Sequence, residues 1–247
     1  IVSLNLEAAE LLELTQWRRD EEVEALPADP VQAEALADEC ADVLLYLILI
    51  MGINGMVMTR DLFNLFVFLE IVSIGTYGLL GFERTPAALA ANFKYIMATV
   101  IASSFFLLGS ALLYHVTGTL NIDDMIANRA LITGPIGTTA CLFVLACLVI
   151  ELKPFPANGW GLDVYETANS GVAALVSVGV SAGVFFALYK LLPLFEGYLA
   201  ILAVSGGITF FFSNLVGLRQ NNVQRMLGYS SIAQMGLLCL ALSLMHQ

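Results

Sequence analysis

The sequence predicts an all-α membrane protein. We expect a polytopic bundle of about seven transmembrane helices, one of them broken near Lys153, with a short acidic helical segment at the N-terminus. The chain has 247 residues, of which 59% are hydrophobic, and its mean hydropathy is +0.83. This composition is typical of polytopic membrane proteins and not of soluble domains. Several uncharged runs also reach the length of about 20 residues that a helix needs to cross a bilayer.

The charges divide the chain into two unlike segments. Residues 1–42 contain 12 of the 21 acidic residues and 2 of the 10 basic residues, whereas the rest of the chain is nearly neutral. We therefore expect an acidic helical segment at 1–46 and a transmembrane domain at 47–247. No basic patch suggests nucleic-acid binding. The four cysteines form no Cys-x-x-Cys pair and are expected to be buried apolar residues.

Five uncharged runs are long enough to be membrane helices. They are Tyr95–Ile122, Ala130–Ile150, Thr167–Tyr189, Gly197–Leu218 and Met226–Gln247. The apolar run Leu62–Leu80, which contains Glu70, adds a sixth helix, and Val43–Thr59, short by itself, adds a seventh. A helix bundle is favoured because backbone polar groups in lipid must be satisfied internally. The more basic set of connections contains Arg84, Lys153, Arg219 and Arg225, and the positive-inside rule places it in the cytoplasm. We therefore expect a multi-pass protein of the cell (inner) membrane with a cytoplasmic N-terminal segment that lacks a signal peptide.

One carboxylate, Glu70, lies in the middle of the run Leu62–Leu80. An ionised side chain at that depth costs several kcal/mol, so an intramembrane acid suggests proton or ion handling. The alternative is a glutamate that pairs with a neighbouring helix and only holds the bundle together.

A second candidate site is the segment ELKPFPANGWGLDVYE at residues 151–166. Pro154 and Pro156 interrupt the helix directly after Lys153 and free backbone groups. Broken helices at membrane depth usually line cavities or ion paths. A lysine beside such a break can exchange its proton near neutral pH, because desolvation disfavours its charged form. The alternative is a lysine that reaches the interface, with the prolines ending an ordinary helix.

The N-terminal segment carries paired carboxylates at helical spacing. Glu7 and Glu10 share one helical face, and Glu39 and Asp42 share another. Two such helices side by side would gather four carboxylates, a ligand set that suits Mg²⁺. The alternative is two solvated acidic faces, with residues 18–33 between the helices as a loop.

The strings LNLEAAELLELTQW (4–17) and LADECADVLLYL (36–47) resemble the core of the MazG-type nucleotide pyrophosphohydrolases. The resemblance implies Mg²⁺ at Glu7, Glu10, Glu39 and Asp42, a base contact at Trp17, and hydrolysis of nucleoside triphosphates. It covers only the first fifth of the chain. Family members also have a preceding helix and a following basic stretch that are missing here. A spliced or composite sequence is therefore one interpretation of the junction.

The rest of the chain resembles the antiporter-like subunits of respiratory complex I, multisubunit Na⁺/H⁺ antiporters and membrane-bound hydrogenases. The segments that carry the resemblance are GINGMVMT (52–59), DLFNLFVFLE (61–70), FKY (93–95), KPFPANGWGLD (153–163) and RMLGYSSIAQMG (225–236). The resemblance implies a proton- or sodium-translocating subunit of a redox-driven complex or antiporter. Glu70 matches the family's membrane glutamate and Lys153 the lysine that it modulates. Other membrane subunits and the bilayer are the expected partners.

Several departures from that family affect the expected relay. A second lysine often follows on the next helix, but this chain has Ser181 there. Water, Lys190 and His115 are therefore candidates for the central relay; His115, near the end of its helix, has an interfacial position as its alternative. The chain covers about seven of the family's fourteen helices, so it is expected to be part of a longer subunit. It has no quinone, iron–sulfur or nickel motif, so no cofactor is expected in the transmembrane domain.

Overall fold

The computed structural model is all-α, which confirms the predicted class, and it describes residues 2–82 and 84–245. The end of the last expected run, residues 246–247, lies outside the described residues. In the described ranges the one β-type pairing is an isolated bridge between Asp61 and Asn121. The segment η3 is a π-helix and the other η segments are 3₁₀-helices. The elements are α1 (Val2–Thr15), α2 (Asp20–Glu24), η1 (Leu26–Ala28), α3 (Pro30–Met58), α4 (Leu62–Gly81), α5 (Pro86–Thr117), α6 (Ile122–Ala127), η2 (Arg129–Thr133), α7 (Pro135–Glu151), α8 (Gly159–Thr167), α9 (Ser170–Ala174), η3 (Leu175–Val180), α10 (Ser181–Leu191), η4 (Leu192–Tyr198), α11 (Leu199–Gly217) and α12 (Val223–Met245).

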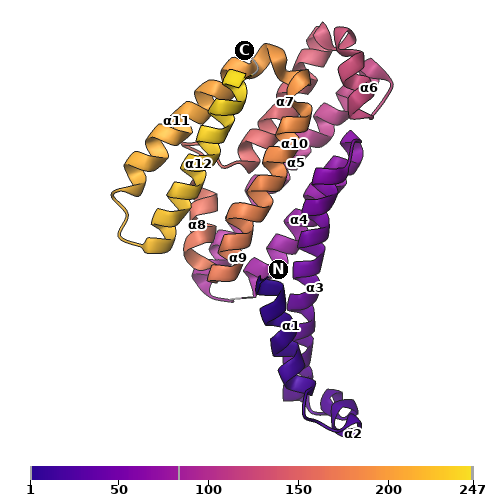
Figure 1. Cartoon of the computed structure of the whole chain (residues 1–247), viewed down its shortest axis with the longest axis vertical. Coiled ribbons are helices and arrows are strands. Elements are labelled where there is room, and N and C mark those ends of the chain that lie inside the picture. Colours follow the sequence, from indigo (N-terminus) through magenta and orange to yellow (C-terminus); the bar gives the residue numbers. More distant parts are fainter. Residues whose placement is uncertain (1, 83, 246–247) are drawn as a thin grey trace.

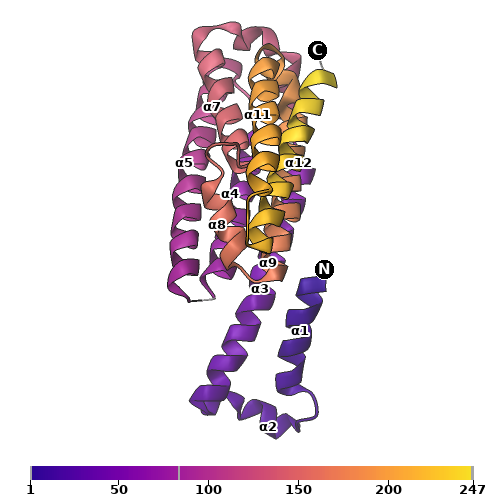
Figure 2. The ribbon, with the colours of Figure 1, turned by 90° about the vertical axis from the view of Figure 1, so that its left-hand side faces the viewer.

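A helix bundle and a smaller head make up the described chain (Figure 1). The head consists of α1, α2, η1 and the N-terminal part of α3, and it projects from one end of the bundle. Helix α1 lies beside α3 and packs against it (Figure 2). Helix α3 has 29 residues, which corresponds to about 43 Å. It runs without a break from the head into the bundle, across the expected boundary at residue 46.

Local capping groups set the starts of the long helices. The Asp29 carboxylate accepts from the backbone of α3, the Asp61 carboxylate from that of α4, and the Thr85 hydroxyl from that of α5. Each of these acceptors satisfies an N–H that has no partner within its helix. Helix α5 ends at Thr117 and is capped by Gly118, whose φ of 72° is the left-handed conformation that glycine adopts most readily.

Five stretches of the described chain are long and apolar enough to cross a membrane. One of them, Ser170–Gly217, turns back at η4, so α10 and α11 are separate crossings (Figure 1). Helix α7 is a shorter apolar helix, and α8 continues beyond the break that follows it. With α10 and α11 counted separately and α7 added, the described chain has an apolar helical segment at each of the seven expected places, although α7 alone is shorter than the other candidate spans.

Some sequence-based boundaries are wrong. The helix expected at Tyr95–Ile122 begins at Pro86 and ends at Thr117, because an uncharged run marks the apolar core of a helix and not its caps. The expected loop at 18–33 contains α2 and η1, and it also includes the first turn of α3. Cys40 is exposed on the head, whereas the other three cysteines are buried as expected.

Helices α11 and α12 approach each other closely at Gly206 and Gly236. A methyl group added to either glycine would lie within 2.7 Å of the other's carbonyl oxygen. Small residues allow membrane helices to approach in this way, and van der Waals contact then stabilises the pair. This pair of helices forms one wall behind the break after α7.

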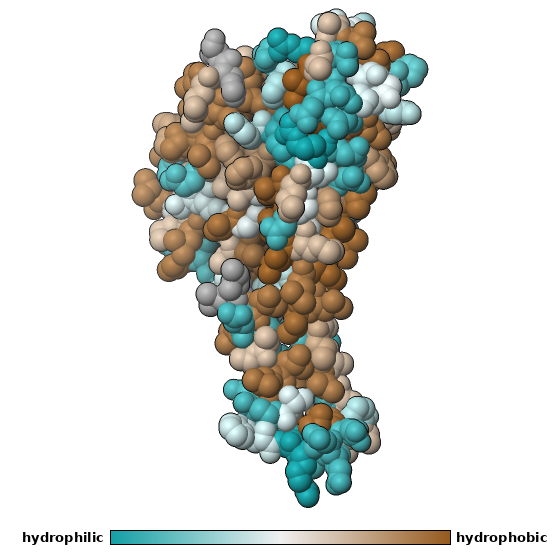
Figure 3. Space-filling model, turned by 45° about the vertical axis from the view of Figure 1, so that its right-hand side comes forward, coloured by the Kyte–Doolittle hydropathy of each residue, from teal (hydrophilic) through white to brown (hydrophobic). Residues whose placement is uncertain are grey.

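The surface pattern matches a membrane protein. In Figure 3 most of the bundle is apolar, whereas polar residues gather at the tip of the head and near the opposite end of the bundle. Exposed apolar side chains on the outer faces include Ile101, Leu108, Ile201 and Phe211. In a bilayer such residues face lipid tails, so their exposure needs no further partner.

Candidate functional site

Glu70 lies near the middle of α4, as its apolar run predicts. Its side chain is half-buried. It interacts electrostatically with Glu151 at the end of α7, and Tyr77, two turns further along α4, interacts with both carboxylates. Because an acid at this depth is costly, the groups around it decide whether it holds a proton.

The chain breaks directly after α7, about halfway along the bundle (Figure 1). Pro154 and Pro156 lack the N–H that a continued helix needs. Between them, the Phe155 N–H donates to the Thr209 hydroxyl on α11 at 3.1 Å. The predicted broken helix near Lys153 is therefore confirmed, and α11 satisfies one of the freed backbone groups.

Lys153 occupies the break and is only 2% exposed. Its ammonium donates to the Ser181 hydroxyl at 3.1 Å and to the Glu151 carbonyl oxygen at 3.4 Å. The ring centroids of Trp160 and Tyr165, both on α8, lie 5.5 and 5.9 Å from Nζ. These are favourable cation–π distances. The side chain therefore stays in the interior and does not reach the interface, which excludes the alternative of an interfacial lysine.

Ser181, the residue found in place of the family's second lysine, is the first residue of α10. It follows the π-helical segment η3, and its hydroxyl donates to the Val176 carbonyl oxygen at 3.3 Å, five residues earlier. π-Helical turns are rare and are frequent at functional sites. Here the π-helical turn directly precedes Ser181, whose neutral hydroxyl accepts a hydrogen bond from the Lys153 ammonium.

Glu151 is the residue of this site that the sequence analysis missed. It is 5% exposed and interacts electrostatically with both Lys153 and Glu70. Among the described residues no salt bridge joins any two of Glu70, Glu151 and Lys153. Because Glu151 interacts electrostatically with both residues of the expected acid–base pair, the site has three ionisable groups and not two. The sequence did contain a signal for Glu151, because this acid lies two residues before Lys153 and close to the two prolines that break the helix.

Two tyrosines border this cluster. The Tyr77 hydroxyl is hydrogen-bonded to Thr99 on α5, and Tyr95, 1% exposed, interacts electrostatically with Glu151. The rings of the two tyrosines meet edge to face at 5.4 Å. They place aromatic rings and hydroxyl groups near the two carboxylates.

Lys190 lies on α10, nine residues after Ser181, or roughly 13 Å along the helix. Its ammonium donates to three carbonyl oxygens at the end of α3, those of Met56 at 2.5 Å, Val57 at 3.1 Å and Thr59 at 2.7 Å. An ammonium has three N–H groups, so this set uses all of them. The geometry is that of a cation at a helix C-terminus. The expected relay role of Lys190 stays a prediction.

Two further predicted residues lie at the surface. His115 is exposed in the last turn of α5. Trp17, the predicted base contact, is 96% exposed beyond the end of α1, with φ 67°. Their proposed roles stay predictions, and the position of His115 agrees with the interfacial alternative.

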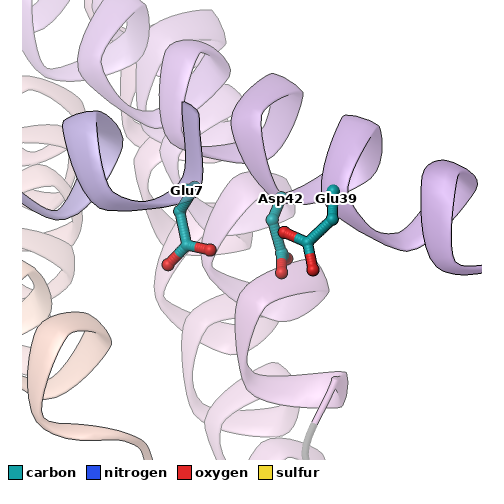
Figure 4. A group of neighbouring side chains, drawn as sticks. All are labelled: Glu7, Glu39 and Asp42. Atoms are coloured by element: carbon teal, nitrogen blue, oxygen red, sulfur yellow. The ribbon is translucent and has the colours of Figure 1, made fainter. Parts of the chain in front are cut away.

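The head gathers three of its four predicted carboxylates. Glu7 from α1 and both Glu39 and Asp42 from α3 have carboxylate oxygens within 4.8 Å of one another (Figure 4). Partial burial, followed by the nearby charges of Asp42, Glu10 and Glu39, raises the pKa of Glu7. Glu10 is exposed and is not part of the group of three, so the expected four-carboxylate set is incomplete.

An ionic network fixes α8 at the head end of the bundle. Asp163 accepts from Lys94 on α5 at 2.6 Å and from Arg225 on α12 at 3.0 Å. The same arginine donates to Glu166 at 2.5 Å. Because α8 carries both rings that contact Lys153, the network holds one side of the lysine pocket in place.

The fold and the site together define a class, that of multi-pass membrane proteins with a buried acid–base cluster at a broken helix. The chain belongs to the NADH:quinone oxidoreductase/Mrp antiporter transmembrane family, whose model matches residues 59–247. This membership confirms the second resemblance.

One similar protein is the NADH-quinone oxidoreductase subunit N of Rubrobacter xylanophilus, 32% identical over 219 residues. The match covers 83% of this chain and 45% of that protein. The chain thus spans about half the length of the curated relatives it matches.

Two solved structures are similar in fold. A chain of the membrane-bound sulfane sulfur reductase, an archaeal respiratory membrane complex, has a TM-score of 0.76 and 33% identity, covering 98% of this chain and 48% of that one. A chain of respiratory complex I from Thermus thermophilus has a TM-score of 0.72 and 27% identity, covering 98% and 49%.

Proposed function

We propose that this chain is an ion-translocating membrane subunit in which Glu70 and Lys153 take part in moving a proton or Na⁺. The observation that carries the proposal is the position of Lys153. It is buried at a helix break and held by a hydroxyl, a carbonyl oxygen and two ring faces. A broken helix at membrane depth usually lines a cavity or an ion path, and Lys153 lies directly at such a break.

The family and the relatives support this proposal. The Rubrobacter xylanophilus relative is a subunit of an NADH-quinone oxidoreductase, and the similar archaeal chain comes from a respiratory membrane complex. We therefore propose other membrane subunits of a redox-driven complex, or of a cation/proton antiporter, as partners. Any electron chemistry then belongs to those partners, and this chain provides part of the ion path.

The test is proton flux through the chain reconstituted in phosphatidylcholine vesicles. A membrane potential set with valinomycin drives the proton flux, and a dye inside the vesicles reports the internal pH. Glu70→Gln should lower the flux by about a hundredfold, the usual contribution of a positioned proton-transfer group. The folded fraction, measured by size-exclusion chromatography, should be unchanged. Wild-type flux in this variant contradicts the proposal, and loss of folding in it supports a purely structural role. Repeating the assay with a Na⁺ gradient identifies the ion.

We further propose that the head lies on the cytoplasmic side of the cell membrane. The connections from α4 to α5 and from α11 to α12 lie at the head end of the bundle (Figure 1). Arg84 and Arg219 lie in these connections and Arg225 in the first turn of α12, and the positive-inside rule assigns this end to the cytoplasm. Cys40 is exposed on the head, whereas the other three cysteines are buried. A membrane-impermeant maleimide should therefore label Cys40 in inverted vesicles and not in intact cells. Labelling in intact cells contradicts this orientation.

A second candidate function, Mg²⁺-dependent nucleoside triphosphate pyrophosphohydrolysis, applies to the head alone. It is favoured by the convergence of Glu7, Glu39 and Asp42, and by one Glu39 oxygen that is buried without a hydrogen-bond partner. Such oxygens would bind Mg²⁺ and orient a triphosphate. Pyrophosphate release should disappear in Glu39→Ala and persist in Glu10→Ala, the matched control outside the group. If no nucleoside triphosphate gives pyrophosphate release, this candidate function is excluded.

A further inference from the structure

Three ionisable side chains interact electrostatically around the helix break through Glu151, although the proposed function uses only two of them. Glu151 comes from the end of α7, Lys153 from the break and Glu70 from the middle of α4. Glu151 and Lys153 are 5% and 2% exposed. Glu151 interacts electrostatically with each of the other two groups, and among the described residues no salt bridge joins any two of the three. Glu151 is therefore a buried carboxylate that senses the charge of both Glu70 and Lys153.

The charge of this cluster is unbalanced when all three groups are ionised. Two carboxylates and one ammonium sum to one negative charge, and an uncompensated charge in a low-dielectric interior is costly. The other titratable groups near Glu151 come from α4, α5, α7 and α8. They are Tyr77, Tyr95, Cys147 and Tyr165, and none of them is a cation.

The nearest basic residues on neighbouring elements have other partners. Lys94 and Arg225 are engaged by the carboxylates of α8, and Lys190 by the end of α3. The cluster therefore becomes neutral by binding one additional proton. A pair made of Glu70 and Lys153 alone would be neutral without it.

We infer that Glu151 is a proton-transfer residue between Glu70 and Lys153. In the neutral cluster Glu70 is a carboxylic acid, Glu151 a carboxylate and Lys153 an ammonium. After the Lys153 ammonium has released its proton to the ion path, the Glu151 carboxylate accepts the proton of Glu70 and passes it to the Lys153 amine. The total charge is conserved in this transfer, and the next proton that binds to Glu70 makes the cluster neutral again. The Ser181 hydroxyl and the rings of Trp160 and Tyr165 hold the Lys153 ammonium. This inference rests on the proposed function, because it assigns one more residue to the same path.

Proton flux in the same vesicles tests the inference. Glu151→Gln keeps the size of the side chain and removes its proton exchange, so flux should fall by about a hundredfold. Glu151→Asp keeps the carboxyl group and should retain most of the flux. The matched control is Glu196→Gln, because Glu196 is exposed at the far end of the bundle and paired with Arg129. Its flux should equal that of the wild type.

Infrared difference spectra provide a second measurement that needs no flux. The carboxyl stretching band that disappears in Glu151→Gln belongs to Glu151. Replacing Glu70 with glutamine removes one of the two charged neighbours of Glu151, so the pH midpoint of the Glu151 band should move by about one pH unit. An unchanged midpoint overturns the inference, because the two carboxylates are then uncoupled.

The outcomes separate the inference from the proposed function. If Glu70→Gln abolishes flux and Glu151→Gln leaves it at the wild-type level, the inference is overturned and the proposed function stands. If wild-type chain in vesicles carries no flux, both are overturned for this chain. If both variants lose flux while Glu151→Asp and Glu196→Gln retain it, the inference is supported.

Discussion

Lys153 and Lys190 belong to the same bundle, but their ammonium groups have different partners. The Lys190 ammonium has a backbone carbonyl oxygen for each of its three N–H groups. Lys153 has one hydroxyl, one longer contact to a carbonyl oxygen and two ring faces. Lys190 is therefore anchored to the backbone at the end of α3, whereas Lys153 is held mainly by side chains at the helix break.

This contrast gives a prediction for Lys190→Met. The change leaves three carbonyl oxygens at the end of α3 without their donor, which should cost about 1–3 kcal/mol. Hydrogen exchange at residues 54–58 should become faster, and the thermal unfolding midpoint in detergent should fall. Proton flux should change by less than about threefold. Unchanged stability together with lost flux would instead identify Lys190 as a relay.

Local sequence predicted Glu70 and Lys153 because each has an unmistakable setting, one in an uncharged run and the other before two prolines. Glu151 was missed because the uncharged run ended one residue before it, which made it look like a flanking charge at a helix end. Its burial depends on the packing of α4 and α5 around the break. The partners of Lys190 lie more than 130 residues away in the chain, and no local pattern identifies them.

At the scale of elements, the break after α7 depends on two supports from other helices. The Thr209 hydroxyl of α11 accepts the Phe155 N–H, and the ionic network of Asp163 fixes α8 to α5 and α12. A broken helix in a membrane is stable only where neighbouring groups satisfy the freed backbone. The prolines made the break predictable, whereas the residues that support it were not, because they lie on separate helices.

Thr209→Val tests the first support. Valine has nearly the same shape but leaves the Phe155 N–H without its acceptor, a change that should destabilise the folded state by about 1–3 kcal/mol. The expected result is a lower thermal unfolding midpoint in detergent, measured by tryptophan fluorescence, since Trp160 lies just beyond the break. Thr209→Ser keeps the hydroxyl and should restore most of the loss. Equal midpoints for the valine variant and the wild type would exclude this support.

At the scale of the whole molecule, the head and the bundle follow different physical rules. The bundle has an apolar surface and pairs its backbone groups internally. The head instead carries a group of three neighbouring carboxylates, which repel one another when they are ionised. The pKa of Glu7 is raised above its ordinary 4.5, first by burial and then by the Asp42 charge. The packed head therefore binds this proton more tightly than separated helices would.

This linkage predicts how pH affects the packing of α1 against α3. The packing should be weakest above the raised pKa of Glu7, strengthen as pH falls through that value, and stop changing below 4.5, where Glu7 is protonated in both states. Spin labels at Cys40 and at an introduced Ala9→Cys would measure the distance distribution between the helices. Glu7→Gln should remove its share of the pH dependence. A distribution that widens on acidification contradicts the prediction.

Helix α3 is a rigid rod with one end in the head and the other gripped by Lys190 from α10. A torque applied to the head, for instance by a bound neighbour, would therefore be transmitted along the rod and not absorbed by a hinge. It would arrive at the helix that carries Ser181, the hydroxyl on which the Lys153 ammonium rests. A ligand bound to the head, such as an antibody fragment, should therefore change the surroundings of the Lys153 ammonium from outside the membrane.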